Sequence, residues 1–161
     1  MAITKQTPLR GAIASQERDS FIAKFDPPVA KLLRQARLAL RKRFPTAVEL
    51  VYDNYNALAI GYSPNERASE VFVSLAAFAR GVNLYFLQGA RLDDPDGLLK
   101  GSGKQGRFIR LERVSQLSDP QVAALIEAAQ AQGKTPLPGK GKGYTVIKSV
   151  STKQRPRRAK A

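Results

Sequence analysis

Hydrophobic residues recur at helical spacing over residues 27–44 and predict one long helix. Asp26 and the two prolines that follow it are typical of a helix start. An aspartate can accept hydrogen bonds from the free amides there, and proline lacks an N–H that the first turn leaves unused. Pro45 ends the helix because proline disfavours the helical conformation at the residue before it. The apolar stripe of this helix consists of Val29, Leu32, Leu33, Ala36, Leu40 and Phe44.

Two further helical segments flank the middle of the chain. A short amphipathic turn around Phe21 and Phe25 is expected to precede the long helix. A last helix begins near Asp119 and Pro120 and ends at Gly133, a residue type that is common just after a helix. Its buried face consists of Val122, Leu125, Ile126 and Ala129.

Between these helices the hydrophobic pattern changes to short runs rich in Val, Leu, Tyr and Phe, separated by Asn, Pro and Gly. The first four runs have short connections, which predict antiparallel neighbours because a parallel crossover needs a dozen or more residues. The expected fold is therefore α+β, with two layers and a sheet of about five antiparallel strands covered by helices on one face, in the order α-β5-α. The predicted strands are 49–53, 57–62, 71–77, 82–87 and 107–112.

The composition of the 161-residue chain excludes several kinds of chemistry. It contains no Cys and no His, so disulfides, thiolate nucleophiles, histidine-based catalysis and Cys- or His-ligated metal sites are impossible within it. No other nucleophile–base pair is identifiable, and the sequence therefore favours a protein that is not an enzyme. No cofactor is predicted.

The charge is strongly basic and unevenly distributed. The chain carries 27 Lys and Arg against 13 Asp and Glu, a net charge of +14. The predicted organisation is an N-terminal extension (1–19), an α+β domain (20–132) and a basic tail rich in Gly, Pro, Lys and Arg (133–161). The tail has no acidic residue, and its cations are Lys134, Lys140, Lys142, Lys148, Lys153, Arg155, Arg157, Arg158 and Lys160.

The tail has two interpretations. Residues 144–150 are rich in β-branched side chains and can add a strand to a sheet edge. The end, KQRPRRAKA, is expected to be solvated because it offers no apolar pattern to pack. It then serves either as an arm that follows phosphates or as a solubilising tail without a dedicated partner.

The loop over residues 101–106 matches the pattern G-x-G-x-x-G, but it lacks the strand–turn–helix context of a dinucleotide site. The loop instead offers backbone amides flanked by Lys104, Arg107 and Arg110. Such a glycine-rich turn is either flexible or an anion-binding nest.

Asp93, Asp94 and Asp96 form the densest acidic cluster. Their spacing is not that of a calcium loop, and Asp-Pro-Asp-Gly is common in turns. No metal ligand is predicted here.

The polar segment YDNYN contains Tyr52, Asp53, Asn54, Tyr55 and Asn56 between two predicted strands. One interpretation is a hairpin turn in which Asp53 and Asn54 bond to the backbone. The other is the rim of a ligand site, with Asp53 as an acceptor and the asparagines orienting a small molecule.

Two stretches resemble the YdhG-like domain family. They are FIAKFDPPVAKLLRQARLALRKRFPTAVELVYDNYNALAIGY and LYFLQGARLDDPDGLLKGSGKQGRFIRL, and the resemblance covers about residues 17–132. It implies an α+β fold similar to that of frataxin. The chain departs from the family pattern at YDNYNALAIGYSPNERAS, where other members have a more compact hairpin.

Some members of that family are described as frataxin-like iron chaperones, which makes iron delivery an alternative function. Iron binding of the frataxin type relies on an acidic ridge on the first helix and first strand. The helix over 27–44 is instead basic. Its cations are Lys31, Arg34, Arg37, Arg41, Lys42 and Arg43.

The leading hypothesis from the sequence is a small intracellular binding protein whose basic tail contacts a polyanion, nucleic acid foremost. Arg34, Arg41 and Lys42, or else the strip from Lys104 to Arg110, are expected to form a second patch. The alternative is a small-ligand protein or enzyme with a site at Tyr52–Asn56. The predicted anion-binding residues are Lys104, Arg107, Arg110, Lys148, Lys153, Arg155, Arg157 and Arg158.

No membrane partner is expected. The N-terminus lacks the continuous apolar stretch of a secretory signal, and the nearly apolar run over 71–79 is too short to cross a bilayer. The predicted location is the cytoplasm.

Overall fold

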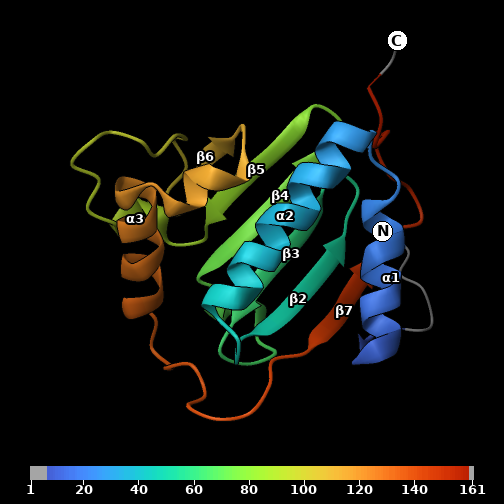
Figure 1. Ribbon diagram of the computed structural model, residues 1–161, viewed down its shortest axis with the longest axis horizontal. Coiled ribbons are helices and arrows are strands. Elements are labelled where there is room, and N and C mark those ends of the chain that lie inside the picture. The colour runs from blue at the N-terminus through green and yellow to red at the C-terminus, as the bar shows by residue number, and fades with distance from the viewer. Residues whose placement is uncertain (1–6, 160–161) are drawn as a thin grey trace.

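The computed structural model describes residues 7–159 and contains three α-helices and one seven-stranded sheet (Figure 1). The helices are α1 (Ala12–Ile22), α2 (Pro27–Arg43) and α3 (Pro120–Ala131). The strands are β1 (Leu9–Arg10), β2 (Val48–Asp53), β3 (Leu58–Ser63), β4 (Val73–Phe78), β5 (Gly81–Phe86), β6 (Arg107–Leu111) and β7 (Thr145–Val150). Short 3₁₀ turns η1 (Ala68–Glu70), η2 (Gly89–Arg91) and η3 (Val114–Ser118) join them.

The hydrophobic patterns of the middle of the chain predicted these elements well. Helix α2 and helix α3 are confirmed, and strands β2 to β6 lie within two residues of the predicted runs. Each of these strands pairs antiparallel with the next along the chain. The short connections predicted this for β2 to β5, whereas β5 and β6 are joined by a long loop. The aspartates Asp26 and Asp119 do stand at the starts of α2 and α3, but neither makes a side-chain capping hydrogen bond.

The predicted five-stranded antiparallel sheet is wrong. The sheet has seven strands in the order β1-β7-β2-β3-β4-β5-β6, and β7 runs parallel to β2, so the sheet is mixed. Strand β1 has only two residues and no periodicity to reveal it. Strand β7 follows a Gly- and Pro-rich segment, and its pairing with β2 depends on a crossover from α3 that the local pattern does not specify.

Residues at both ends of the chain join the sheet. Strand β1 and most of helix α1 lie within the segment 1–19 predicted as an N-terminal extension, and β7 lies within the predicted basic tail. The strand expected over 144–150 does form, as Thr145–Val150, but it pairs on both sides, with β1 and with β2. The sequence indicated only a short turn near Phe21 because α1 buries Arg18 on the face that a simple amphipathic helix would fill with apolar residues.

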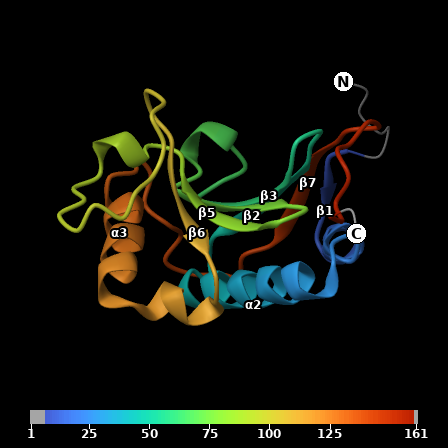
Figure 2. The ribbon, with the colours of Figure 1, turned by 90° about the horizontal axis from the view of Figure 1, so that it is seen from above.

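The main hydrophobic core lies between the helices and one face of the sheet, and Figure 2 shows the helices on that side. Ile60, Leu75 and Leu84 stand on this face and are fully buried against α2 and its neighbours. A small second cluster of Val48, Leu50 and Val146 lies on the other face. Within residues 7–159, no helix has the length and apolar character needed to cross a bilayer.

Candidate functional site

Two carboxylates on strand β2, Glu49 and Asp53, lie in the layer between sheet and helices. They are four residues apart, so they share one face of the strand, and both are fully buried. Burying an ionised carboxylate is costly unless hydrogen bonds and opposite charges surround it. The partners of these two groups therefore explain much of the local arrangement of basic residues.

Glu49 is completely surrounded by donors. Its Oε1 accepts hydrogen bonds from Arg18 Nη1 at 2.9 Å and Thr145 Oγ1 at 2.8 Å. Its Oε2 accepts them from Arg37 Nε at 2.9 Å and the Tyr62 hydroxyl at 2.7 Å. Burial acts to raise the pKa of Glu49, but the two guanidinium groups and the two hydroxyl donors together hold that pKa below its ordinary value. Glu49 is thus an ionised, structural carboxylate that fixes helices α1 and α2 and strand β7 on β2.

Two members of the Glu49 network border a cavity of about 580 Å³, which we call the basic pocket. Arg37 and Thr145, two of the Glu49 donors, line it directly. The lining includes four cations and no acidic residue. The cations are Arg37, Arg41, Lys42 and Lys142.

The four cations differ in how they are held. Arg37 uses Nε for Glu49, and its terminal nitrogens have no hydrogen-bond partner among the described residues. Arg41 donates through Nη1 to the carbonyl of Ala47 at 2.6 Å. Lys42 and Lys142 are exposed, and neither pairs with a carboxylate of residues 7–159. Two oriented guanidiniums and two freely turning ammonium groups therefore converge on one cavity.

The backbone shapes the rim of the basic pocket at two glycines. Gly11 adopts a φ of +75° at the start of α1, whose first turn carries neither a side-chain cap nor an acidic residue. Gly143 donates its amide to Pro45 at 2.8 Å, and a Cβ there would collide with the Ala47 carbonyl and with Arg41. Glycine at 143 thus lets the segment before β7 pass close to the end of α2 and brings Lys142 to the pocket.

The positive surface continues from the pocket along helix α2. Lys31, Arg34 and Lys42 are exposed on it and form no hydrogen bond or ion pair within the described part of the chain; we call these three residues the basic stripe. Helix α2 contains no acidic residue. The stripe spans the twelve residues from Lys31 to Lys42, or about 16 Å of helix.

The predicted anion-binding residues at the end of the chain are largely engaged within the protein. Arg157 is 6% exposed, and its Nη2 donates to Asp53 Oδ1 at 2.9 Å and to the carbonyl of Asn54 at 2.6 Å. Lys24 Nζ contacts the other oxygen of Asp53 at 2.7 Å. The expectation that the end of the chain is solvated is therefore wrong at Arg157, because the buried Asp53 needs this cation.

The neighbours of Arg157 are also attached to the fold. Arg155 donates to Asn56 Oδ1 at 3.0 Å and lies over the ring of Tyr55. Arg158 donates to the carbonyl of Lys24 at 3.1 Å. Its guanidinium also lies 3.6 Å from the carboxylate of Asp26. Lys148 Nζ donates to the carbonyl of Glu66 at 2.8 Å, whereas Lys153 is exposed.

The remaining predicted anion-binding residues lie at the opposite edge of the sheet, on β6 and the loop before it. Arg107 is turned back onto this loop, where it donates to the carbonyls of Gly103 and Gly106. Arg110 donates to the carbonyl of Arg80, and Lys104 is exposed. These three cations therefore lie apart from the predicted anion-binding residues on β7 and after it.

The segment Tyr52–Asn56 is a hairpin turn whose side chains diverge. Asp53 lies on the helix-facing side, whereas Tyr52 packs with the small cluster on the other face, and its buried hydroxyl has no partner among the described residues. Asn54 donates its amide to Ala57 across the turn and accepts a hydrogen bond from Ser149. None of the five predicted site residues lines the basic pocket or the second cavity described next.

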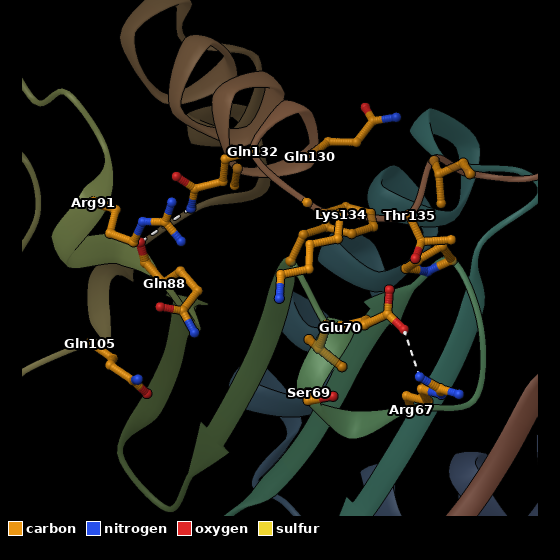
Figure 3. Close-up of a pocket in the computed structure, with 16 residues that line it drawn as sticks. Arg67, Ser69, Glu70, Gln88, Arg91, Gln105, Gln130, Gln132, Lys134 and Thr135 are labelled. Carbon is orange, nitrogen blue, oxygen red and sulfur yellow. Dashed lines mark hydrogen bonds and ion pairs between the residues drawn. The ribbon is translucent and has the colours of Figure 1, made fainter.

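A second cavity, of about 550 Å³, lies where β3 and β5 end and β4 and β6 begin (Figure 3). We call it the glutamine-lined pocket because Gln88, Gln105, Gln130 and Gln132 all line it. No sequence pattern predicted this pocket. Its residues come from the segments 64–72, 88–105 and 129–137, and no motif links them.

The described residues do not form a metal centre of the usual kind. Over residues 7–159, no group of three or more acidic side chains lies together in a way that could hold a metal ion, and the chain has no His or Cys. Comparisons of the chain with protein-family models, with curated proteins and with solved structures find no match.

Proposed function

We propose that this protein binds nucleic acid through the basic pocket and the adjoining basic stripe. The observation that carries the proposal is a cavity lined by four cations and no carboxylate, with Arg37 oriented by the buried Glu49. Charged hydrogen bonds to phosphate are strongest where the donors are held in place beforehand. The arrangement therefore suits an anion with several oxygens.

The extent of the positive surface favours a polymer over a single small anion. The stripe adds Lys31 and Arg34 on the same helix, outside the pocket. Its length of about 16 Å matches about five phosphate steps along one strand of a duplex. Such contacts go to phosphates rather than to bases, so binding is expected to be independent of sequence.

This proposal moves the contact surface away from the end of the chain. The basic composition of residues 133–161 predicted that the main contacts lie there, but Arg157 is buried and Arg155 and Arg158 contact the fold. Removing residues 133–161 would also remove β7 from the sheet. Truncation is therefore a poor test, and substitutions at exposed lysines are preferable. The resemblance to the YdhG-like family and the cytoplasmic location stay hypotheses from the sequence.

The test uses two variants that each lose three positive charges. The first, Lys31→Gln, Lys42→Gln and Lys142→Gln, removes cations from the stripe and pocket. The matched control, Lys100→Gln, Lys104→Gln and Lys153→Gln, removes cations elsewhere. All six lysines are exposed.

Binding is measured by fluorescence anisotropy with a labelled 20-base-pair duplex at about 50 mM salt. We expect the pocket variant to lose at least about tenfold in affinity and the control to stay within about threefold of the unmodified protein. Equal losses in the two variants would show that only net charge matters. A larger loss in the control would return the contact surface to the sites predicted from the sequence.

A further inference from the structure

The glutamine-lined pocket contains a carboxylate oxygen that is buried without a partner. Glu70, on η1, accepts a hydrogen bond through Oε2 from Asn65 Nδ2 at 2.8 Å, and Arg67 Nη1 lies 4.0 Å from the same oxygen. Glu70 Oε1 is buried and has no hydrogen-bond partner among the described residues. The Thr135 hydroxyl beside the carboxylate and the hydrogen bond from Asn65 hold the pKa of Glu70 below its ordinary value. Thr135 is nevertheless not placed for a full hydrogen bond to Oε1, which leaves this oxygen able to accept one from a ligand.

Cations and amides line the same cavity. Figure 3 shows the side chains of Lys134 and Arg91 around the space beside Glu70, and neither forms an ion pair with a carboxylate of the described residues. The side-chain amides of Gln88 and Gln105 also line it, and neither makes a hydrogen bond within residues 7–159. The cavity thus offers one acceptor without a donor, two cations without an anion, and two amides without partners.

Apolar side chains complete the lining. Val71, Phe72 and Leu137 border the pocket near Glu70. The cavity volume of about 550 Å³ falls within the range of small-molecule sites and exceeds what a single inorganic anion fills. A flat ring with N–H donors on one edge and an attached anionic group would match this lining. The donors face the Glu70 carboxylate, the anion faces the cations, and the ring packs on the apolar side chains.

We propose that the glutamine-lined pocket binds a mononucleotide, with guanosine monophosphate as its best ligand. Guanine presents N–H donors, N1–H and the 2-amino group, to a carboxylate such as Glu70. The phosphate is placed on Arg91 and Lys134, and the ring lies against the apolar residues. Gln88 and Gln105 contact the remaining polar edges of the nucleotide. This site is distinct from the basic pocket, since no residue lines both.

The probe is guanosine monophosphate, titrated into the full chain by isothermal calorimetry. Titrations run in the background Lys31→Gln, Lys42→Gln and Lys142→Gln, so that phosphate binding at the basic pocket does not contribute. We expect saturable binding of one ligand per chain. Guanosine, which lacks the phosphate, and inosine monophosphate, which lacks the 2-amino group, are each expected to bind at least about tenfold more weakly.

Two single substitutions in that background assign the site. Glu70→Gln keeps the side-chain shape, and we expect it to weaken guanosine monophosphate binding by at least about tenfold. Arg91→Gln changes an exposed residue and is expected to weaken guanosine monophosphate but not guanosine. The proposal is overturned if the nucleotide does not bind, if inorganic phosphate binds as well as the nucleotide, or if both variants bind it unchanged. Loss of duplex binding in the background variant leaves this result unaffected, so the two proposals fail separately.

Discussion

Two glutamates differ in how they are hydrogen-bonded: Glu49 binds residues that line the basic pocket, and Glu70 itself lines the glutamine-lined pocket. Glu49 beneath the basic pocket receives four hydrogen bonds and two positive charges, whereas Glu70 in the glutamine-lined pocket leaves one buried oxygen without a donor. A carboxylate whose oxygens all accept hydrogen bonds within the protein cannot bind a ligand directly. Its role is to hold the cations that donate to it in position for a ligand. A half-satisfied carboxylate keeps part of its bonding capacity for a molecule that is not part of the chain. Burial alone therefore does not tell a structural carboxylate from a binding one; the count of its donors does.

The largest effect is expected from Glu49→Gln. The substitution keeps the size of the side chain but leaves Arg18 and Arg37 without their buried counter-charge. Breaking a buried pair in this way costs about 3–5 kcal/mol of unfolding free energy. Urea denaturation at pH 7 measures it.

A matched control and a pH series sharpen that result. Glu66→Gln, which removes a more exposed ion pair with Arg10, should cost under about 1 kcal/mol. The pKa of Glu49 is lower in the folded chain than in the unfolded chain, so the stability it contributes is present above about pH 4.5 and is lost as the pH falls below that. Glu66, whose pKa is lowered to about 2 by Arg10 and Tyr144, loses its contribution over the same descent. A stability that does not fall between pH 5 and pH 2 would contradict the assignment of Glu49 as an ionised group.

An intermediate effect is expected from Arg157→Gln. This variant tests Asp53, the second buried carboxylate of β2, each of whose oxygens accepts a hydrogen bond from a cation. The variant removes one of the two cations that contact Asp53, but Lys24 remains. We expect a loss of about 2–3 kcal/mol in unfolding free energy and faster proteolysis after residue 150. Arg155→Gln, which changes an exposed neighbour, should cost under about 0.5 kcal/mol. Similar small losses in both variants would indicate that the end of the chain is not held by Asp53.

The smallest effect is expected from Glu70→Gln on stability. The lowered pKa of Glu70 means that the fold favours its charged form, but the side chain is partly exposed and a glutamine can still accept the hydrogen bond from Asn65. We therefore expect the unfolding free energy to fall by much less than in Glu49→Gln. Thermal unfolding without ligand measures it beside Glu49→Gln. A large loss would show that Glu70 is structural like Glu49 and would remove the contrast between them.

The spacing of hydrophobic residues along the chain predicts much of the fold, because this spacing indicates which side chains are buried. The apolar spacing of α2 and the hydrophobic runs of β2 to β6 predicted their elements, and short connections predicted the antiparallel pairing of β2 to β5. Strand β7 and helix α1 did not follow in the same way. The parallel pairing of β7 with β2 is non-local, and α1 turns the charged Arg18 inward to reach Glu49.

The candidate sites were less accessible to sequence reasoning. The basic character of Arg41 and Lys42 was visible, but their meeting with Lys142 depends on the path of residues 132–144 across the end of α2. Arg157 was expected in solvent because nothing in the sequence pairs it with Asp53, 104 positions away. Glu70 shows no local sign of its missing donor, which appears only once three distant segments form the cavity.

The central claim, that cations of the basic pocket and basic stripe contact phosphates, is tested most directly by the salt dependence of duplex binding. The six cations of the pocket and stripe, namely Lys31, Arg34, Arg37, Arg41, Lys42 and Lys142, should give a slope of log affinity against log salt of about −5. The variant Lys31→Gln, Lys42→Gln and Lys142→Gln should reduce that slope to about −3. An unchanged slope in this variant, or no binding by the unmodified protein at low salt, would contradict the account.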